Sequence, residues 1–99
     1  MIAKKHVTHD RRLILALCDR DIIGKKFSEN EAILDLTVDF YKGEELSEKE
    51  IERLMKAAYL INIAGKKSVA LAKKLKLAEE KHIITIQKIP HAQILVVRE

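Results

Sequence analysis

Two short segments with apolar residues, separated by a polar stretch, open the chain and predict β-strands. Residues 2–7 and 12–18 predict two strands, and the residues between them, with Asp10 at the centre, have the composition of a turn. The second strand is apolar on both of its faces, which is typical of a central strand in a sheet. We therefore expect a hairpin at the start of the chain, with its second strand inside the sheet.

A regular alternation of apolar and polar residues lies near the middle of the chain. Residues 33–40 predict a half-buried strand, because acidic residues and threonine alternate there with apolar residues. We expect four of its side chains to face the core, those of Leu34, Leu36, Val38 and Phe40. The polar side chains between them are expected to face water.

Apolar residues then recur every three or four positions, which predicts helices. Ser47 and Glu50 form a capping box at the start of the first helix. The helical pattern continues over residues 48–76, and we expect two helices with a break near residues 58–62. The second helix is expected to bury one stripe of side chains, made up of Ile61, Ala64, Ser68, Leu71, Ala72 and Leu75.

The last segment returns to strands. Residues 82–87 are β-branched and alternating, and residues 93–97 are mostly apolar. Pro90 has no N–H group, so we expect it in the turn between these two strands. The whole chain, residues 1–99, is predicted to be a single α+β domain with the order β-β-β-α-α-β-β. We expect a mainly antiparallel sheet of about five strands with two helices packed on one face.

Composition narrows the class of protein. Hydrophobic residues make up 47% and charged residues 34% of the chain, which is typical of a globular protein and not of a disordered one. Lysine and glutamate dominate the charges while asparagine, glutamine and cysteine are scarce, as in thermophile proteins. No apolar run approaches the roughly 20 residues of a membrane span, and the N-terminus lacks an apolar signal core. We expect a cytoplasmic protein without a membrane partner.

Candidate catalytic chemistry is sparse. The chain has no P-loop, no G-x-S-x-G and no H-E-x-x-H sequence. The remaining options pair His91 with Asp19 as acid and base, or with the single cysteine, Cys18, which the strand pattern favours as a core residue. The four histidines lack a metal-binding spacing. We expect no metal site and no cofactor.

Paired lysines are the clearest binding signal in a chain whose net charge is +4. Successive helical residues are rotated by about 100°, so the paired lysines of the second predicted helix lie on its outer face, with Asn62 at the edge of that face. The predicted binding lysines are Lys66, Lys67, Lys73 and Lys74 on this face, with Lys25 and Lys26 as a further pair. Such a face is suited to follow a phosphate backbone without reading its sequence.

Few aromatic residues are present for stacking on bases. The chain has two tyrosines, two phenylalanines and no tryptophan, and we expect only Tyr41 and Tyr59 at the surface. Single-stranded RNA is usually recognised by stacking on aromatic side chains, whereas double-stranded RNA is recognised by its shape and backbone. The pattern therefore favours structured RNA, or a ribonucleoprotein, as the ligand.

Three segments carry a resemblance to known sequences: CDRDIIGKKF at residues 18–27, NIAG at 62–65 and IPHAQIL at 89–95. Over essentially the whole chain, the sequence resembles a family of small archaeal proteins known as domain of unknown function 424. The resemblance implies an archaeal origin and a loose association with translation and RNA-related genes, but no activity. The positions that match the family pattern are Asp19, Gly24, Asn62, Gly65, Pro90, His91 and Gln93.

Two interpretations of these matching residues remain open. In an extended chain, His91 and Gln93 project to the same side, where they either tie down loop backbone or present an imidazole and an amide to a ligand. A shared polar patch requires Asn62, His91 and Asp19 to lie in one neighbourhood of the fold.

The sequence thus favours a non-enzymatic module that binds structured RNA or a ribosomal particle of the translation machinery. A protein–protein adaptor or a homodimer is the alternative, because a small sheet with exposed edges can pair with a partner strand. A small enzyme that uses His91 is the third option.

Overall fold

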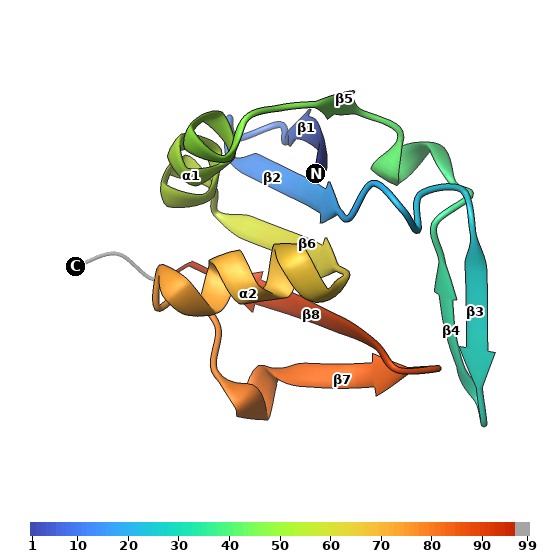
Figure 1. Ribbon diagram of the computed structural model, residues 1–99. Coiled ribbons are helices and arrows are strands. Elements are labelled where there is room, and N and C mark those ends of the chain that lie inside the picture. Colours follow the sequence, from blue (N-terminus) through green and yellow to red (C-terminus); the bar gives the residue numbers. More distant parts are fainter. Residues whose placement is uncertain (97–99) are drawn as a thin grey trace.

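The computed structural model describes residues 1–96, and Figure 1 shows their arrangement. A six-stranded sheet has the order β5-β1-β2-β6-β8-β7, and β3 and β4 form a separate hairpin. The sheet strands are β5 (Glu44–Glu45), β1 (Ile2–Val7), β2 (Leu13–Cys18), β6 (Leu60–Ala64), β8 (Ile89–Leu95) and β7 (Ile83–Ile86). The other elements are β3 (Lys26–Glu29), β4 (Ala32–Asp35), the helices α1 (Glu48–Ala57) and α2 (Lys66–Lys74), and the short 3-10 helices η1 (Asp39–Tyr41) and η2 (Glu80–His82).

The predicted α+β class, with a mainly antiparallel sheet, is confirmed, but the predicted order of elements is incomplete. The strands β3, β5 and β6 were not predicted, and β4, the strand expected near the middle of the chain, lies in the separate hairpin and not in the main sheet. All neighbouring strands of the main sheet are antiparallel except β2 and β6, which are parallel. The helical prediction for residues 60–64 is wrong, because they form the central strand β6. A central strand is apolar on both faces, so its short apolar run is hard to distinguish from a buried helical stripe. The predicted break between the helices is therefore a whole strand.

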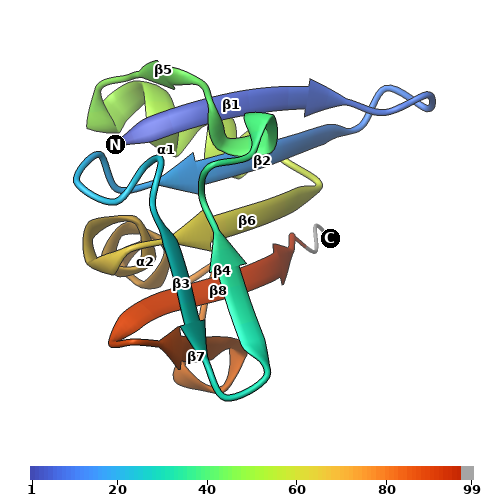
Figure 2. The ribbon, with the colours of Figure 1, turned by 90° about the vertical axis from the view of Figure 1, so that its right-hand side faces the viewer.

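The two faces of the sheet are covered by different elements. Both helices pack on one face, as predicted, and the β3–β4 hairpin crosses the other face (Figure 2). The core on the helix face includes Leu15, Leu17, Ile61 and Ile63 from the sheet, Ile51 and Met55 from α1, and Val69, Leu71 and Ala72 from α2. The core on the hairpin face includes Ala16, Cys18, Ala64, Leu34, Leu36 and Tyr41. Each strand in the middle of the sheet thus supplies side chains to two cores.

The predicted start of α1 is confirmed. Ser47 is its N-cap, and the Glu50 backbone N–H donates to the Ser47 hydroxyl oxygen at 3.2 Å. The Ser47 hydroxyl in turn donates to Oε1 of Glu50 at 3.1 Å. Because the two capping residues are close in sequence, the start of this helix can be predicted from the sequence alone.

The strand predicted over residues 33–40 is wrong in its second half. β4 ends at Asp35, whose Oδ1 accepts a hydrogen bond of 2.9 Å from the Thr37 backbone N–H. This aspartate turn competes with strand pairing and bends the chain away. Leu36 is still buried as predicted, but Val38 is 42% exposed.

The turn between the last two strands does not contain Pro90, contrary to the prediction. The turn consists of Gln87 and Lys88, which have φ values of 49° and 66°, and Pro90 lies within β8 opposite Thr85. The Pro90 carbonyl accepts the Gly65 N–H, so the backbone groups of Pro90 face β6 and its missing N–H takes no bond from the β7–β8 ladder. On the β6 side, Pro90 lies one position beyond the last strand pair, Ala64–His91. Val96 lies beyond β8, and Val97, also predicted as strand, is outside the described residues.

Candidate functional site

The outer surface of α2 carries the predicted lysine face, which we define as Lys66, Lys67, Lys73 and Lys74. All four side chains are exposed, whereas Ser68, Val69, Leu71 and Ala72 on the inner side are buried. The two lysine pairs are seven residues apart, so they lie two turns apart, or about 10 Å, along the helix axis. The position of the lysine face is therefore as predicted, on a helix packed against β6 and β8 (Figure 1).

A buried carboxylate caps the N-terminus of α2. Asp19 is 5% exposed and follows β2 directly. Its Oδ2 accepts the Lys67 backbone N–H at 2.9 Å, and its Oδ1 accepts the Ser68 N–H and the Ser68 hydroxyl, each at 2.7 Å. Helix N-termini are favourable places for negative charge. Asp19 thus occupies the backbone donors that a phosphate group would otherwise take, and only the lysine side chains of this turn are left for a ligand.

Gly65 allows the carboxylate to approach the helix so closely. Its φ is 110°, and a side-chain carbon at this position would overlap the Asp19 side chain. Gly65 also donates its N–H to the Pro90 carbonyl at 2.9 Å, and the Asp19 N–H donates to the Ala64 carbonyl at 3.0 Å. These contacts explain Asp19, Gly65 and Pro90 as architecture at one end of the sheet.

The charge around the lysine face is strongly one-sided. The sequence has no acidic residue between Glu52 and Glu79, and α2 has none in its first turn. Lys73 forms an ion pair with Glu80, and no other lysine of this face forms an ion pair within residues 1–96. Most of the lysine face is therefore positively charged and unneutralised.

Lys25 and Lys26 do not extend the lysine face. Lys26 begins β3 opposite Asp35, and the hairpin packs on the face of the sheet opposite the helices (Figure 2). Gly24 also belongs to this hairpin region, where its N–H donates to the Leu36 carbonyl at 2.9 Å and its φ is 82°. This pair of lysines is exposed but forms a separate surface.

The predicted polar patch is close together in its backbone but divided in its side chains. Asn62 lies opposite Gln93, and Ala64 lies opposite His91, in the β6–β8 pair. Asn62, His91 and Gln93 share the hairpin face, because they alternate with residues of the helix-face core. Asp19 turns to the helix face and caps α2. Asn62 was predicted at the edge of the lysine face, and this prediction is wrong, because Asn62 lies in β6 and not in a helix.

The side chains of this group differ in their freedom. Nδ1 of His91 is 2.8 Å from the Ile63 carbonyl oxygen, which is the backbone contact expected of a structural histidine. Gln93 is exposed and Asn62 is half-buried. The two amides thus form the part of the predicted patch that faces solvent on the sheet.

The residues considered for catalysis have other partners. The Cys18 side chain is buried, and burial raises the pKa of its thiol to about 12, so thiolate is scarce at neutral pH. Cys18 lies opposite Ala64, so β6 separates it from His91. The Asp19 carboxylate is engaged with α2. Among residues 1–96, no cluster of three or more histidine, cysteine or acidic side chains is arranged to hold a metal ion.

Two aromatic side chains were predicted at the surface, and one of them is not there. Tyr41 is 7% exposed, contrary to the prediction, because it belongs to the core under the hairpin. Tyr59 is half-buried, and the Arg12 guanidinium lies 4.3 Å from its ring centroid. The described surface therefore offers little aromatic area for base stacking.

Neither helix within residues 1–96 has the length and apolar character that a membrane span requires.

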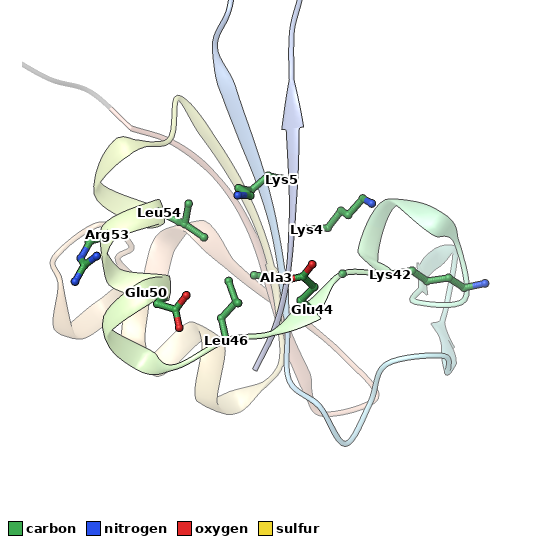
Figure 3. Close-up of a pocket in the computed structure, with 10 residues that line it drawn as sticks. Ala3, Lys4, Lys5, Lys42, Glu44, Leu46, Glu50, Arg53 and Leu54 are labelled. Carbon is green, nitrogen blue, oxygen red and sulfur yellow. The ribbon is translucent and has the colours of Figure 1, made fainter.

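A second basic surface was not predicted. A groove of about 600 Å³ lies between α1 and the edge of β1 (Figure 3). It is lined by Ala3, Lys4, Lys5, Lys42, Gly43, Glu44, Leu46, Glu50, Arg53 and Leu54. The sequence signal for this groove was the lysine pair of β1, Lys4 and Lys5. Side chains alternate along a strand, so these two lysines were not expected to line one surface.

The fold and the site define a small α+β protein with one basic helix face. The chain belongs to the family described as protein of unknown function (DUF424), whose model matches residues 6–97. The fold is similar to the crystal structure of an uncharacterized conserved protein from Methanopyrus kandleri, with a TM-score of 0.77 and 26% sequence identity. The match covers 99% of this chain and 93% of that one. No curated protein matches the chain.

Proposed function

We propose that the protein is a binding module that holds the phosphate backbone of structured RNA, free or within a ribonucleoprotein, on the lysine face of α2. The observation that carries this proposal is the exposure of four lysines on one short helix that has no acidic side chain. Lysine contacts to phosphates release counterions and provide affinity that does not depend on sequence.

The position of Lys66 and Lys67 supports a role in binding. Both lie in the first turn of α2, where the helix dipole makes positive charge unfavourable by about 0.3–1 kcal/mol per residue. Their side chains therefore contribute little to the stability of the helix. The Asp19 carboxylate allows this placement from the buried side, and a phosphate ligand would add negative charge on the exposed side, where the lysine side chains lie.

The scarcity of exposed aromatic residues supports structured RNA over single strands. Proteins that bind single strands stack bases on aromatic side chains and arginine planes, and Tyr41 is buried in this chain. The choice of RNA over DNA rests on the association with translation genes that the family resemblance implies.

The test is a titration of an RNA hairpin, a single-stranded RNA of equal length and duplex DNA of equal length, each at several salt concentrations. We expect the hairpin to bind most tightly, with log K falling linearly as log salt rises. Lys66→Gln combined with Lys67→Gln should reduce the magnitude of this slope by about 2, roughly one for each lysine that no longer neutralises a phosphate.

The matched control is Lys25→Gln combined with Lys26→Gln. It removes the same charge from the hairpin, away from the lysine face. Equal loss of affinity in the two variants would show an effect of net charge alone and would contradict the proposed site. Tighter binding of the single strand would contradict the proposed ligand.

A protein adaptor is the second candidate function. The observation in its favour is the uncovered edge of β1, which lies beside a groove lined by apolar and basic side chains.

A further inference from the structure

The outer edge of β1 is covered over only part of its length. β5 pairs with Ile2 and Ala3, and within residues 1–96 no strand pairs with β1 beyond them on this side. The chain leaves the edge at Gly43, where a side-chain carbon would overlap the Ala3 carbonyl. Val7, at the far end of β1, is 70% exposed. The second half of β1 is thus an open strand edge.

The direction of the free backbone groups follows from the hydrogen bonds at the two ends of β1. On the outer side, the Leu46 N–H donates to the Met1 carbonyl. On the inner side, the Thr8 N–H donates to the segment that enters β2. Alternate residues of a strand direct their backbone groups to the same side. The N–H and C=O groups of Lys5 and Val7 therefore point outward, where a further strand would pair.

The groove beside this edge combines apolar and basic side chains. Leu46 and Leu54 provide apolar surface (Figure 3). Lys42 pairs with Asp39 at 3.3 Å. The remaining cations of the groove, Lys4, Lys5 and Arg53, are exposed and form no ion pair within the described part of the chain.

Acidic side chains in the groove do not cancel this charge. The lining has two acidic residues, Glu44 and Glu50, against four basic ones, Lys4, Lys5, Lys42 and Arg53. The groove therefore favours a ligand that carries negative charge together with apolar groups.

A second copy of this chain does not fit the edge well. Antiparallel pairing of two β1 edges would bring Lys4 and Lys5 of each copy close to the same lysines of the other. Like charges on neighbouring strands are destabilising, and lysines on edge strands are a common protection against self-association. The same lysines attract a strand of opposite charge.

We propose that the open edge of β1 binds an extended acidic segment of a partner protein, which adds a strand beside Lys5 and Val7. Backbone hydrogen bonds to these two residues would hold the segment, as in other cases of strand addition. Side chains alternate along a strand, so the acidic residues of the segment would lie on the face of Lys4, and its apolar residues would lie on the other face, against Val7 and Leu54. Lys5 and Arg53, beside this apolar contact, would add to the attraction of the acidic segment as a whole. The proposal is independent of RNA binding, because it uses the opposite end of the sheet order from β8 and β7 and no residue of α2.

The test uses a fluorescent peptide in which glutamate and valine alternate, titrated against the full chain at low salt. Binding should slow hydrogen exchange at the Lys5 and Val7 amides, which are free on the outer side, by about tenfold or more as they gain partners. Val7→Pro should weaken binding by about tenfold or more, because it removes an outward donor that β2 does not use.

Two further variants separate charge from strand pairing. Lys4→Gln combined with Lys5→Gln should weaken peptide binding by about tenfold at low salt. Lys66→Gln combined with Lys67→Gln, which removes the same charge from α2, should leave peptide binding unchanged. This second variant also separates the present proposal from the RNA proposal.

Three outcomes would overturn the inference. Peptide binding without protection of the Lys5 and Val7 amides would show a purely electrostatic contact. Protection of these amides that depends on protein concentration without peptide would show a second copy at the edge. Protection by the RNA hairpin but not by the peptide would make this groove an RNA contact.

Discussion

The two helices begin in opposite ways. α1 starts with the neighbouring pair Ser47 and Glu50, and the acidic residues of its first turn suit the helix dipole. α2 starts with two lysines and has no cap of its own, and its carboxylate comes from Asp19, which is 48 positions away from Lys67 in the chain. The N-terminal cap of α1 comes from residues next to the helix in sequence, whereas the cap of α2 comes from a residue that only the tertiary fold brings near.

The difference indicates why α2 can carry basic side chains in its first turn. The buried carboxylate of Asp19 accepts hydrogen bonds from the backbone N–H groups at the start of α2, on the buried side of the helix. Gly65 leaves room for this carboxylate. The outer surface of the turn is then free to carry lysines, which a helix that relied on its own first turn would not favour. In this account, Asp19 stabilises the helix and the lysine face binds the ligand.

The largest expected effect is that of Asp19→Ala. It leaves the Ser68 hydroxyl and two backbone N–H groups of α2 without their acceptor, and we expect a loss of about 3–4 kcal/mol in the free energy of unfolding. Asp19→Asn keeps one acceptor oxygen and should lose about half as much. Urea denaturation measures both, and a loss below about 1 kcal/mol for Asp19→Ala would contradict the role of this cap.

Gly65→Ala should destabilise the protein by about 2–3 kcal/mol, because it combines a positive φ with overlap of the Asp19 side chain. Gly24→Ala is the matched control, since Gly24 has a φ of 82° and open space around it. The control should cost only about 1 kcal/mol of backbone strain. Thermal unfolding of both variants tests this, and equal losses would argue against close contact between Gly65 and Asp19.

Ser47→Ala should have a smaller effect, about 1 kcal/mol, because it removes one local cap of α1 at the surface. Urea denaturation of this variant beside Asp19→Ala sharpens the comparison between the helices. A loss as large as that of Asp19→Ala would mean that the local cap and the tertiary cap are equivalent.

The smallest effect is expected for Lys66→Gln, and its sign is the informative part. Removing positive charge from the first turn should raise the free energy of unfolding by about 0.3–0.5 kcal/mol at low salt. Lys74→Gln removes the same charge from the last turn and should lower it by a similar amount. A stability loss in Lys66→Gln would show that this lysine supports the fold.

Local signals made part of the fold predictable. β1, β2 and α1 were predicted because their signals are local: two short segments with a turn between them for the strands, and a capping pair at the start of the helix. β6 was assigned to the helical pattern, because its short apolar run directly follows α1 and continues the helical spacing of apolar residues. Pro90 was placed in a turn because its tolerance inside β8 depends on which neighbour each residue bonds.

The candidate sites, too, were predictable only where the signal is local in the sequence. The lysine face was predictable, since helical spacing alone sets its register. The cap of α2 by Asp19 was not, because it joins the end of β2 to a helix far along the chain. The groove beside β1 also depends on tertiary contacts, since α1 forms one of its walls.

The most direct test of the central claim is a map of backbone amide NMR shifts during titration with the RNA hairpin. The account predicts shifts concentrated on α2, from Lys66 through Lys74, with β1 unaffected. Shifts confined to the groove beside β1, or absent from α2 at saturation, would contradict it.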